Sequence, residues 1–101
     1  MPDKTLTPER LRSLLATFKE RHGEEYGLRV LGYFGSYARN TAQQTSDIDI
    51  VFDTDAPNLF MTAMMKQDLE ELLGYPVDVL QLRGLTNPRL KARIEKEAVY
   101  V

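Results

Sequence analysis

Three short stretches of the chain combine residue types that could bind phosphate and a metal ion. Residues 35–40 read G-S-Y-A-R-N, residues 46–50 read S-D-I-D-I, and residues 77–80 read V-D-V-L. A glycine before a helix start lets an anion approach backbone N–H groups, and carboxylate oxygens are ligands for Mg²⁺, Mn²⁺ or Ca²⁺. The three stretches could support phosphate chemistry at a metal ion if the fold brings them together.

The acidic pair Asp47 and Asp49 is informative only if it is partly buried. Side chains alternate along a strand, so both carboxylates point to one face while Ile48 points to the other. Two residues span about 6.6 Å, where two carboxylates repel by about 2.5 kcal/mol at an effective dielectric of 20 and about 0.6 kcal/mol in water. The apolar neighbours favour a partly buried pair that a divalent cation neutralises. The alternative is a solvated strand end.

The other two stretches also allow two interpretations each. Ser36 is placed to cap a short helix over residues 37–41, whose free N–H groups would bind phosphate. The alternative is an ordinary strand-to-helix turn. Asp78 is a charge among apolar strand residues and calls for a partner, unless it simply faces solvent.

Capping residues and apolar patterns predict alternating helices and strands. N-cap residues precede the helices, glycines end them, and short apolar runs form the strands. The predicted elements are a helix from Thr7-Pro8 to Gly23, a strand at 28–34, a short helix at 37–41, a strand at 48–52, a helix from Asn58 to Gly74, a strand at 77–82, a helix opened by Asn87-Pro88, and an apolar tail at 99–101.

Only one strand arrangement brings the three stretches together. The first two strands must be antiparallel, and the third must be parallel to the second through a right-handed helical crossover. This predicts an α/β (α+β) fold with a mixed three-stranded sheet, covering helices and the order α-β-α-β-α-β-α. One end of the sheet would gather Gly35, Ser36, Asp47, Asp49 and Asp78, a set that suits two-metal phosphoryl or nucleotidyl transfer.

Composition excludes several other classes of protein. The 101 residues contain no Cys and one His, which argues against disulfides and against thiolate or imidazole metal sites. The net charge of −2 lacks the basic excess of a dedicated nucleic-acid binder. There is no apolar stretch long enough for a membrane span and no signal peptide. We therefore expect a cytoplasmic protein with a single domain over residues 1–101 that binds neither membrane nor nucleic acid directly.

The combined motif resembles the nucleotidyltransferase fold related to DNA polymerase β. The G-S-x-A-R form on so short a chain is most similar to the minimal nucleotidyltransferases, which are antitoxins paired with HEPN-domain ribonuclease toxins. The resemblance spans residues 28–82, and the run at 90–100 is also similar to the family's ending. One departure is Asn40, where the family usually has glycine. Asparagine tolerates positive φ better than other residues with a side chain, so the turn is expected to persist.

The resemblance implies roles for the site residues. Asp47, Asp49 and Asp78 would be catalytic and would hold Mg²⁺, with Mn²⁺ as an alternative, and Asp78 would help to deprotonate the attacking hydroxyl. Arg39 would reach phosphate or the carboxylates, and the alternative is an internal ion pair. The implied nucleotide-binding residues are Gly35, Ser36, Arg39 and Ser46.

The resemblance also implies an activity and a partner. The chain would use Mg-ATP to transfer AMP to a tyrosine of a HEPN ribonuclease toxin and so silence it, as part of a homo- or hetero-oligomer. A catalytic core without an acceptor-binding domain fits an acceptor that is itself a protein. Alternatives are an antitoxin that neutralises by binding alone, a transferase for a small-molecule acceptor, and an unrelated αβ domain. Nucleotide preference, the number of groups transferred, and the roles of Asp53 and Asp55 stay open.

Overall fold

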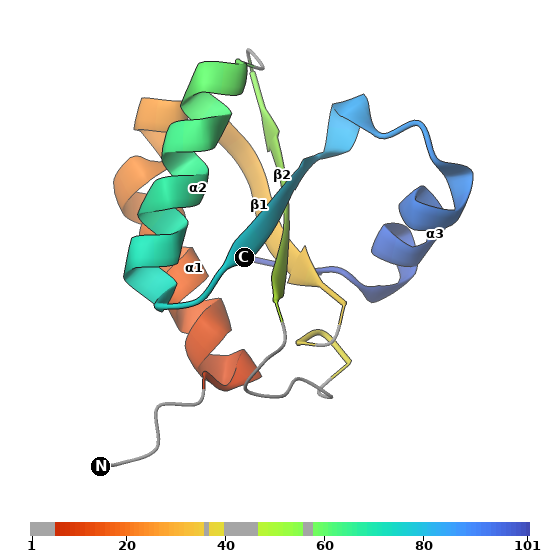
Figure 1. Cartoon of the computed structure of the whole chain (residues 1–101), viewed down its shortest axis with the longest axis horizontal. Helices are drawn as coiled ribbons and strands as arrows, with labels where there is room; N and C mark the ends of the chain where they lie inside the picture. The colour runs from red at the N-terminus through yellow and green to blue at the C-terminus, as the bar shows by residue number, and fades with distance from the viewer. Residues whose placement is uncertain (1–5, 36, 40–46, 56–57) are drawn as a thin grey trace.

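A mixed four-stranded sheet lies between two layers of helices (Figure 1). The computed structural model describes residues 6–35, 37–39, 47–55 and 58–101. The spatial order of the strands is β3-β2-β1-β4. The strands are β1 (Leu28–Phe34), β2 (Ile48–Thr54), β3 (Val77–Gln81) and β4 (Val99–Tyr100). β1 is antiparallel to β2 and β2 is parallel to β3, which confirms the predicted directions.

The helices begin at the capping residues that the sequence indicates. They are α1 (Pro8–Tyr26), α2 (Leu59–Leu73) and α3 (Pro88–Glu97), with a 3₁₀ turn, η1 (Leu82–Gly84), after β3. The Thr7 hydroxyl accepts a hydrogen bond from the Arg10 N–H at 3.1 Å, and the Asn58 and Asn87 side chains cap α2 and α3 in the same way. In Figure 1, α1 and α2 lie on one side of the sheet and α3 lies on the other.

The first helix is longer than predicted. We expected Gly23 to end it, but Gly23 lies buried inside α1, and the helix continues for 19 residues to Tyr26. Gly27 ends it instead, with φ of 65° and an N–H that donates to the Glu24 carbonyl at 3.2 Å. Of Gly23 and Gly27, only Gly27 has the left-handed conformation that closes a helix, and sequence alone does not separate the two.

The C-terminal tail is a fourth strand, so the prediction of three strands was wrong. Val99 pairs with Tyr33 and Tyr100 with Gly32, and the Val101 N–H donates to the Leu31 carbonyl at 2.9 Å. These bonds satisfy backbone groups on the β1 edge that would otherwise be unpaired. Between β1 and β2, the described part of the predicted short helix is a turn at residues 37–39, closed by the Arg39 N–H and the Gly35 carbonyl at 3.0 Å.

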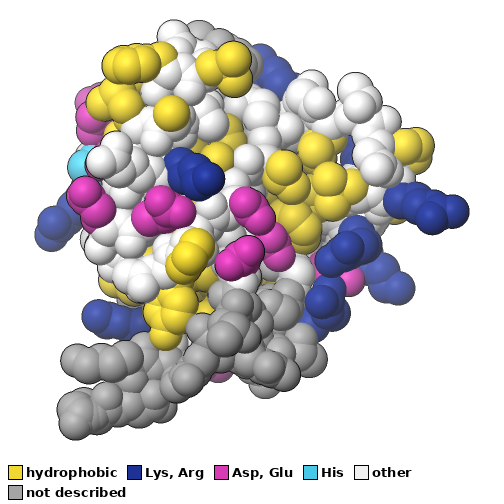
Figure 2. Space-filling model, in the orientation of Figure 1, with side chains coloured by type: hydrophobic (Ala, Val, Ile, Leu, Met, Phe, Trp, Pro, Cys, Tyr) yellow, Lys and Arg dark blue, Asp and Glu magenta, His cyan; other side chains and the backbone are white. Residues whose placement is uncertain are grey.

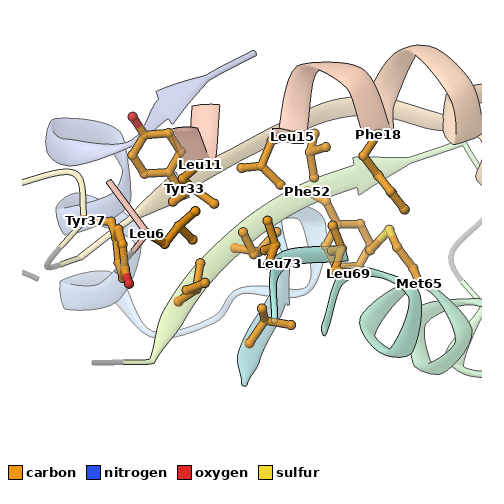
Figure 3. Close-up of a cluster of buried hydrophobic side chains, with 14 of the residues drawn as sticks. Leu6, Leu11, Leu15, Phe18, Tyr33, Tyr37, Phe52, Met65, Leu69 and Leu73 are labelled. Atoms are coloured by element: carbon orange, nitrogen blue, oxygen red, sulfur yellow. The ribbon is translucent and has the colours of Figure 1, made fainter. Parts of the chain in front are cut away.

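Each face of the sheet has its own hydrophobic cluster. Against α1 and α2, alternate residues of β2 pack with both helices, as Figure 3 shows for Phe52 between Phe18, Leu69 and Met65. On the opposite face, Ile94 of α3 packs against Phe34 and Val51. The larger cluster fixes which side chains of each strand face inward, so it also fixes which ones face α3. None of the described helices is both long and apolar enough to cross a membrane.

Replacing Gly32 by alanine should destabilise the protein because β4 lies directly over it. A Cβ at position 32 would lie 2.5 Å from the Val99 carbonyl oxygen and 3.1 Å from Tyr100 Cα. We expect Gly32→Ala to lower the free energy of unfolding by about 1–3 kcal/mol, the usual cost of overpacking, in urea denaturation. Gly23→Ala is the matched control, because its Cβ would meet only Lys19 Cγ at 3.8 Å. Helix propensity should make the control about 0.5–1 kcal/mol more stable. Equal effects would contradict the β4 packing.

Candidate active site

The strand register brings two of the three predicted aspartates side by side. Asp49 in β2 is the register partner of Asp78 in β3 and, on its other side, of Phe34 at the end of β1. Neighbouring strands are about 4.8 Å apart, so the two carboxylates share one face and one end of the sheet. That face is the one covered in part by α3, because Ile48 and Ile50 point into the cluster under α1 and α2. Asp47 immediately precedes β2 at the same end and is exposed.

Gly35 lies against the Asp49 carboxylate. Its φ is 80°, in the left-handed region, and a Cβ at this position would overlap the Asp49 carboxylate. Both the backbone conformation and the space therefore require glycine here. The sequence prediction placed Gly35 at the end of the first strand and beside the acidic pair, and the structure brings it there.

Asp49 is the carboxylate on which the site's charges act most strongly. It is half-buried, and burial, followed by the neighbouring Asp78, raises its pKa above the ordinary value. Asp47 raises the pKa further, while the guanidinium groups of Arg93 and Arg39 oppose the increase. Asp78 is exposed. The site is thus a cluster of like charges that is only partly neutralised by the chain itself.

A pair of arginines borders the acidic end of the sheet. Arg39, which follows the glycine turn, donates from Nη1 to Glu97 Oε1 at 3.0 Å. Glu97 is at the end of α3 and also has Arg93 Nε at 3.9 Å. Figure 2 shows basic side chains to the right of the acidic group near the centre of this face, in the part of the view where α3 lies. The sequence prediction included Arg39 but missed Arg93 and Glu97.

A signal for the missed residues was available in the sequence. Arg93 and Glu97 have the i, i+4 spacing of a helical ion pair, and they flank Ile94, the residue by which α3 packs on the sheet. What the spacing does not reveal is that α3 lies over the same sheet face as Asp49. That placement depends on the tertiary fold.

Asp49 and Asp78 could provide one or two of the oxygen ligands of a divalent cation, with the remaining ligands supplied from outside the chain. Among the residues that the structure describes, no three acidic or histidine side chains are close enough together to enclose a metal ion. Mg²⁺ rarely uses such an all-protein cage and instead binds one or two carboxylates together with water and substrate phosphates. Adjacent Asp49 and Asp78, with repulsion between them and a half-buried position, match that requirement.

Several candidate residues do not contribute to this end of the described structure. Ser36, Asn40 and Ser46 lie outside the described residues, so their predicted roles stay predictions. Asp53 faces the same side of the sheet but binds Arg83 Nε at 2.9 Å and Gln81 Nε2 at 3.1 Å. Asp55 forms an ion pair with Arg29 at 3.0 Å. Both aspartates are at the opposite end of β2, where each has a counter-charge.

A hollow at that opposite end is separate from the acidic site. Its volume is about 360 Å³, and it lies between the end of α1, the end of β2 and the start of α2, bordered by Tyr26, Thr54 and Met61. None of the predicted site residues lines it. The hollow therefore gives no reason to move the site away from the three aspartates.

The sequence is similar to known proteins over nearly its whole length. Residues 11–101 match the family described as the nucleotidyltransferase domain. One relative, the protein adenylyltransferase MntA of Thermococcus cleftensis, is 37% identical over 97 residues, which cover 95% of this chain and 97% of the relative. The match extends through α3 and β4, so it includes the elements that border the site as well as those that carry the aspartates.

Solved structures share the fold. One that is assigned to a minimal nucleotidyltransferase has a TM-score of 0.80 at 32% identity and covers 96% of this chain and 98% of its own. A second comes from a tri-AMPylated Shewanella oneidensis HEPN toxin in complex with MNT antitoxin. Its TM-score is 0.60 at 20% identity, with 97% of this chain and 71% of that chain covered. At that identity the second match shows a shared fold alone.

Asp49 and Asp53 lie on one face of β2. Their carboxylates should have opposite effects on the free energy of unfolding. The pKa of Asp49 is raised, so its charge destabilises the fold, and Asp49→Asn should raise the free energy of unfolding at pH 7 without added metal. The pKa of Asp53 is lowered, chiefly by its hydrogen bond from Arg83, so Asp53→Asn should lower that free energy. Each effect should be about 0.2–1 kcal/mol, the range for cross-strand like charges and for partly exposed ion pairs.

The pH dependence provides the check on this pair. A depressed pKa stabilises above the ordinary aspartate value of 3.8, and that stability is lost as pH falls through the folded-state pKa. A group with a raised pKa makes its full contribution to the free energy of unfolding below pH 3.8, and this contribution is lost as the pH rises through the folded-state pKa. The difference for Asp49→Asn should therefore shrink as the pH falls through the raised pKa of Asp49 towards 3.8, whereas the difference for Asp53→Asn should shrink only as the pH falls below 3.8. Effects of the same sign at pH 7 in urea denaturation would contradict the assigned charges.

Proposed function

The chain belongs to the nucleotidyltransferase domain family, and from that premise we propose that it transfers AMP from Mg-ATP to a tyrosine of a HEPN ribonuclease toxin. The observation that carries the proposal is the convergence of Gly35, Asp49 and Asp78 at one end of the sheet, with Asp47 beside them. This is a donor set for a divalent cation next to a glycine turn that an anion can approach.

Each group of the site has a task in the proposed reaction. Asp47, Asp49 and Asp78 would hold Mg²⁺, which supplies charge neutralisation on the triphosphate. The tyrosine oxygen attacks the α-phosphorus, the bond from that phosphorus to the bridging oxygen of the β-phosphate breaks, and pyrophosphate leaves. The tyrosine proton passes to Asp78, which is exposed and so accessible to an incoming acceptor. Gly35 and the turn after it would position the triphosphate.

A protein acceptor fits both the fold and the relatives. The described elements form one sheet with its covering helices, and both β3 and α3, which lie beside the aspartates, belong to it. An acceptor that is itself a protein would bring most of its own binding surface to this arrangement. The Thermococcus cleftensis relative, matched over 97% of its length, is a protein adenylyltransferase, and the fold recurs in an antitoxin complex that contains an AMPylated HEPN toxin.

A second candidate function is neutralisation of the toxin by binding alone. Binding alone would not require adjacent carboxylates at this end of the sheet, whereas the register places Asp49 beside Asp78, whose charge raises the pKa of Asp49. Transfer to a small-molecule acceptor is a further alternative. It would need a pocket next to the aspartates, whereas the hollow of about 360 Å³ between α1, β2 and α2 has none of the three aspartates in its lining.

Intact-mass spectrometry of the toxin tests the proposal directly. The purified chain, incubated with ATP, Mg²⁺ and a cognate HEPN ribonuclease toxin, should add one AMP or a short run of AMP groups to a toxin tyrosine. A chelator should abolish the mass gain, and renewed Mg²⁺ should restore it, because the carboxylates need a cation to accept a triphosphate. No mass gain, together with undiminished neutralisation of the toxin by Asp47→Ala and Asp49→Ala variants, would favour the binding-only antitoxin.

The role of Asp78 can be separated from general effects of losing a carboxylate. Asp78→Asn should lower the rate of AMP transfer by about a hundredfold or more, the range expected for loss of a general base or a metal ligand. The matched control is Asp53→Asn, on the same face at the far end of the sheet, which should leave the rate within about twofold since Asp53 pairs with Arg83. Single-turnover kinetics with excess transferase measure both. Similar losses in the two variants would contradict the placement of the site.

A further inference from the structure

The C-terminal segment of the chain brings α3 to the acidic end of the sheet. Val99 in β4 pairs with Tyr33, one residue before the end of β1, so the chain leaves α3 close to Phe34 and Gly35. Ile94 packs on Phe34 and Val51, both of which flank Asp49 on its face of the sheet. The C-terminal half of α3, which carries Arg93 and Glu97, therefore borders Asp49.

Glu97 connects this turn to the glycine turn. Its Oε1 atom accepts from Arg39 at 3.0 Å and lies 3.9 Å from Arg93 Nε. The Glu97 side chain is only 20% exposed, whereas the two arginine side chains are 45% and 52% exposed. A largely buried Glu97 side chain thus anchors two arginine side chains that are each about half exposed.

Arg39 and Arg93 do not contact Glu97 equally closely. Arg39 makes a hydrogen bond at 3.0 Å, while the Arg93 contact at 3.9 Å is an ion pair without a hydrogen bond. Arg93 also lowers the pKa of Asp49 more than Arg39 does. Arg93 is therefore the cation that acts most on Asp49 and the one with more of its fork of N–H donors available.

The N–H donors of the two arginines would offset negative charge that divalent cations leave unneutralised at the site. Three aspartates and a nucleoside triphosphate carry more negative charge than two divalent cations can neutralise. Cleavage next to the α-phosphorus moves further negative charge onto the departing pyrophosphate. A guanidinium group suits this position because its planar fork binds two phosphate oxygens at once and its charge persists at any physiological pH.

We propose that Arg93 binds the β- and γ-phosphates of the nucleotide and thereby selects triphosphates over monophosphates. Glu97 holds the Arg93 side chain in place beside Arg39. The inference rests on the proposed nucleotidyltransferase function and concerns the donor nucleotide, whatever the acceptor is. Arg93 contacts the part of the substrate that becomes pyrophosphate. Loss of Arg93 should therefore weaken the binding of ligands that carry β- and γ-phosphates and have little effect on the binding of monophosphates.

Equilibrium binding without the toxin tests this. The affinities of wild type and Arg93→Ala for ATP, for its analogue with an imido group between the β- and γ-phosphates, and for AMP are measured calorimetrically in Mg²⁺. Arg93→Ala should weaken both triphosphates by about ten- to a hundredfold, the loss expected for one charge-assisted phosphate contact, and AMP by less than about twofold. Arg93→Lys, which keeps the charge without the fork, should give an intermediate loss.

Lys91→Ala is the matched control, because it removes an exposed cation from the same helix. It should leave all three affinities unchanged, and urea denaturation should show that every variant is folded. Equal weakening of ATP and AMP by Arg93→Ala, or no weakening of either, would overturn the inference. So would an equal loss of ATP affinity in Lys91→Ala, which would indicate a general effect of positive charge on α3.

The outcome is separable from that of the proposed function. If wild type binds Mg-ATP with the expected dependence on Arg93 but never modifies the toxin, the phosphate role stands and the toxin as acceptor is wrong. If wild type binds no triphosphate, the proposed function and the role of Arg93 are both wrong. If the toxin is modified but Arg93→Ala binds ATP normally, only the role of Arg93 fails.

Discussion

The parallel register of β2 and β3 places Asp49 directly beside Asp78, and the remainder of the site is arranged around that repulsion. Apolar side chains on the opposite face hold the register. Ile48 and Ile50 in β2 and Val77 in β3 are in the core under α1 and α2. A slip of one residue would turn these side chains to the α3 face and the carboxylates into the core. The hydrophobic effect thus keeps two like charges adjacent that would otherwise separate.

The contrast between the two ends of β2 shows that this repulsion is specific to one place. Asp53 lies on the same face as Asp49, yet it has Arg83 and Gln81 as partners and a lowered pKa. Asp49 has a raised pKa and no hydrogen-bonded cation among the described residues. An aspartate is therefore neutralised by an arginine of the chain at one end of the strand, and at the other end it lies beside a second carboxylate, as the proposed cation site requires. Such perturbed carboxylates are typical of functional sites.

The C-terminal segment has a larger part in the site than its small share of the core suggests. β4 covers the open edge of β1, and the strand pairing fixes where α3 ends. Glu97 then joins α3 to the turn after Gly35 through Arg39. One segment therefore protects the sheet edge and also brings counter-charges to the aspartates. Gly32 and Gly35 permit this, since a side chain at either position would collide with β4 or with the Asp49 carboxylate.

Sequence alone predicted the features that local physics controls. Capping residues gave the starts of α1, α2 and α3, and the need for a crossover gave the directions of the first three strands. It also placed Gly35 and Asp78 next to the acidic pair. Local patterns were ambiguous where two candidates look alike, as with Gly23 and Gly27, which differ only in the backbone angles that the finished helix imposes.

Tertiary structure decided what depends on contacts between residues far apart in the chain. The tail at 99–101 is a strand only because β1 offers an unpaired edge, and Arg93 borders the site only because α3 packs across β1 and β2 through Ile94. The pairing of Arg39 with Glu97 spans 58 residues of sequence. Nothing in the local pattern encodes these contacts, because their energy comes from surfaces that exist only once the sheet has formed. The sequence therefore determined the carboxylates of the site, and the fold determined the cations that accompany them.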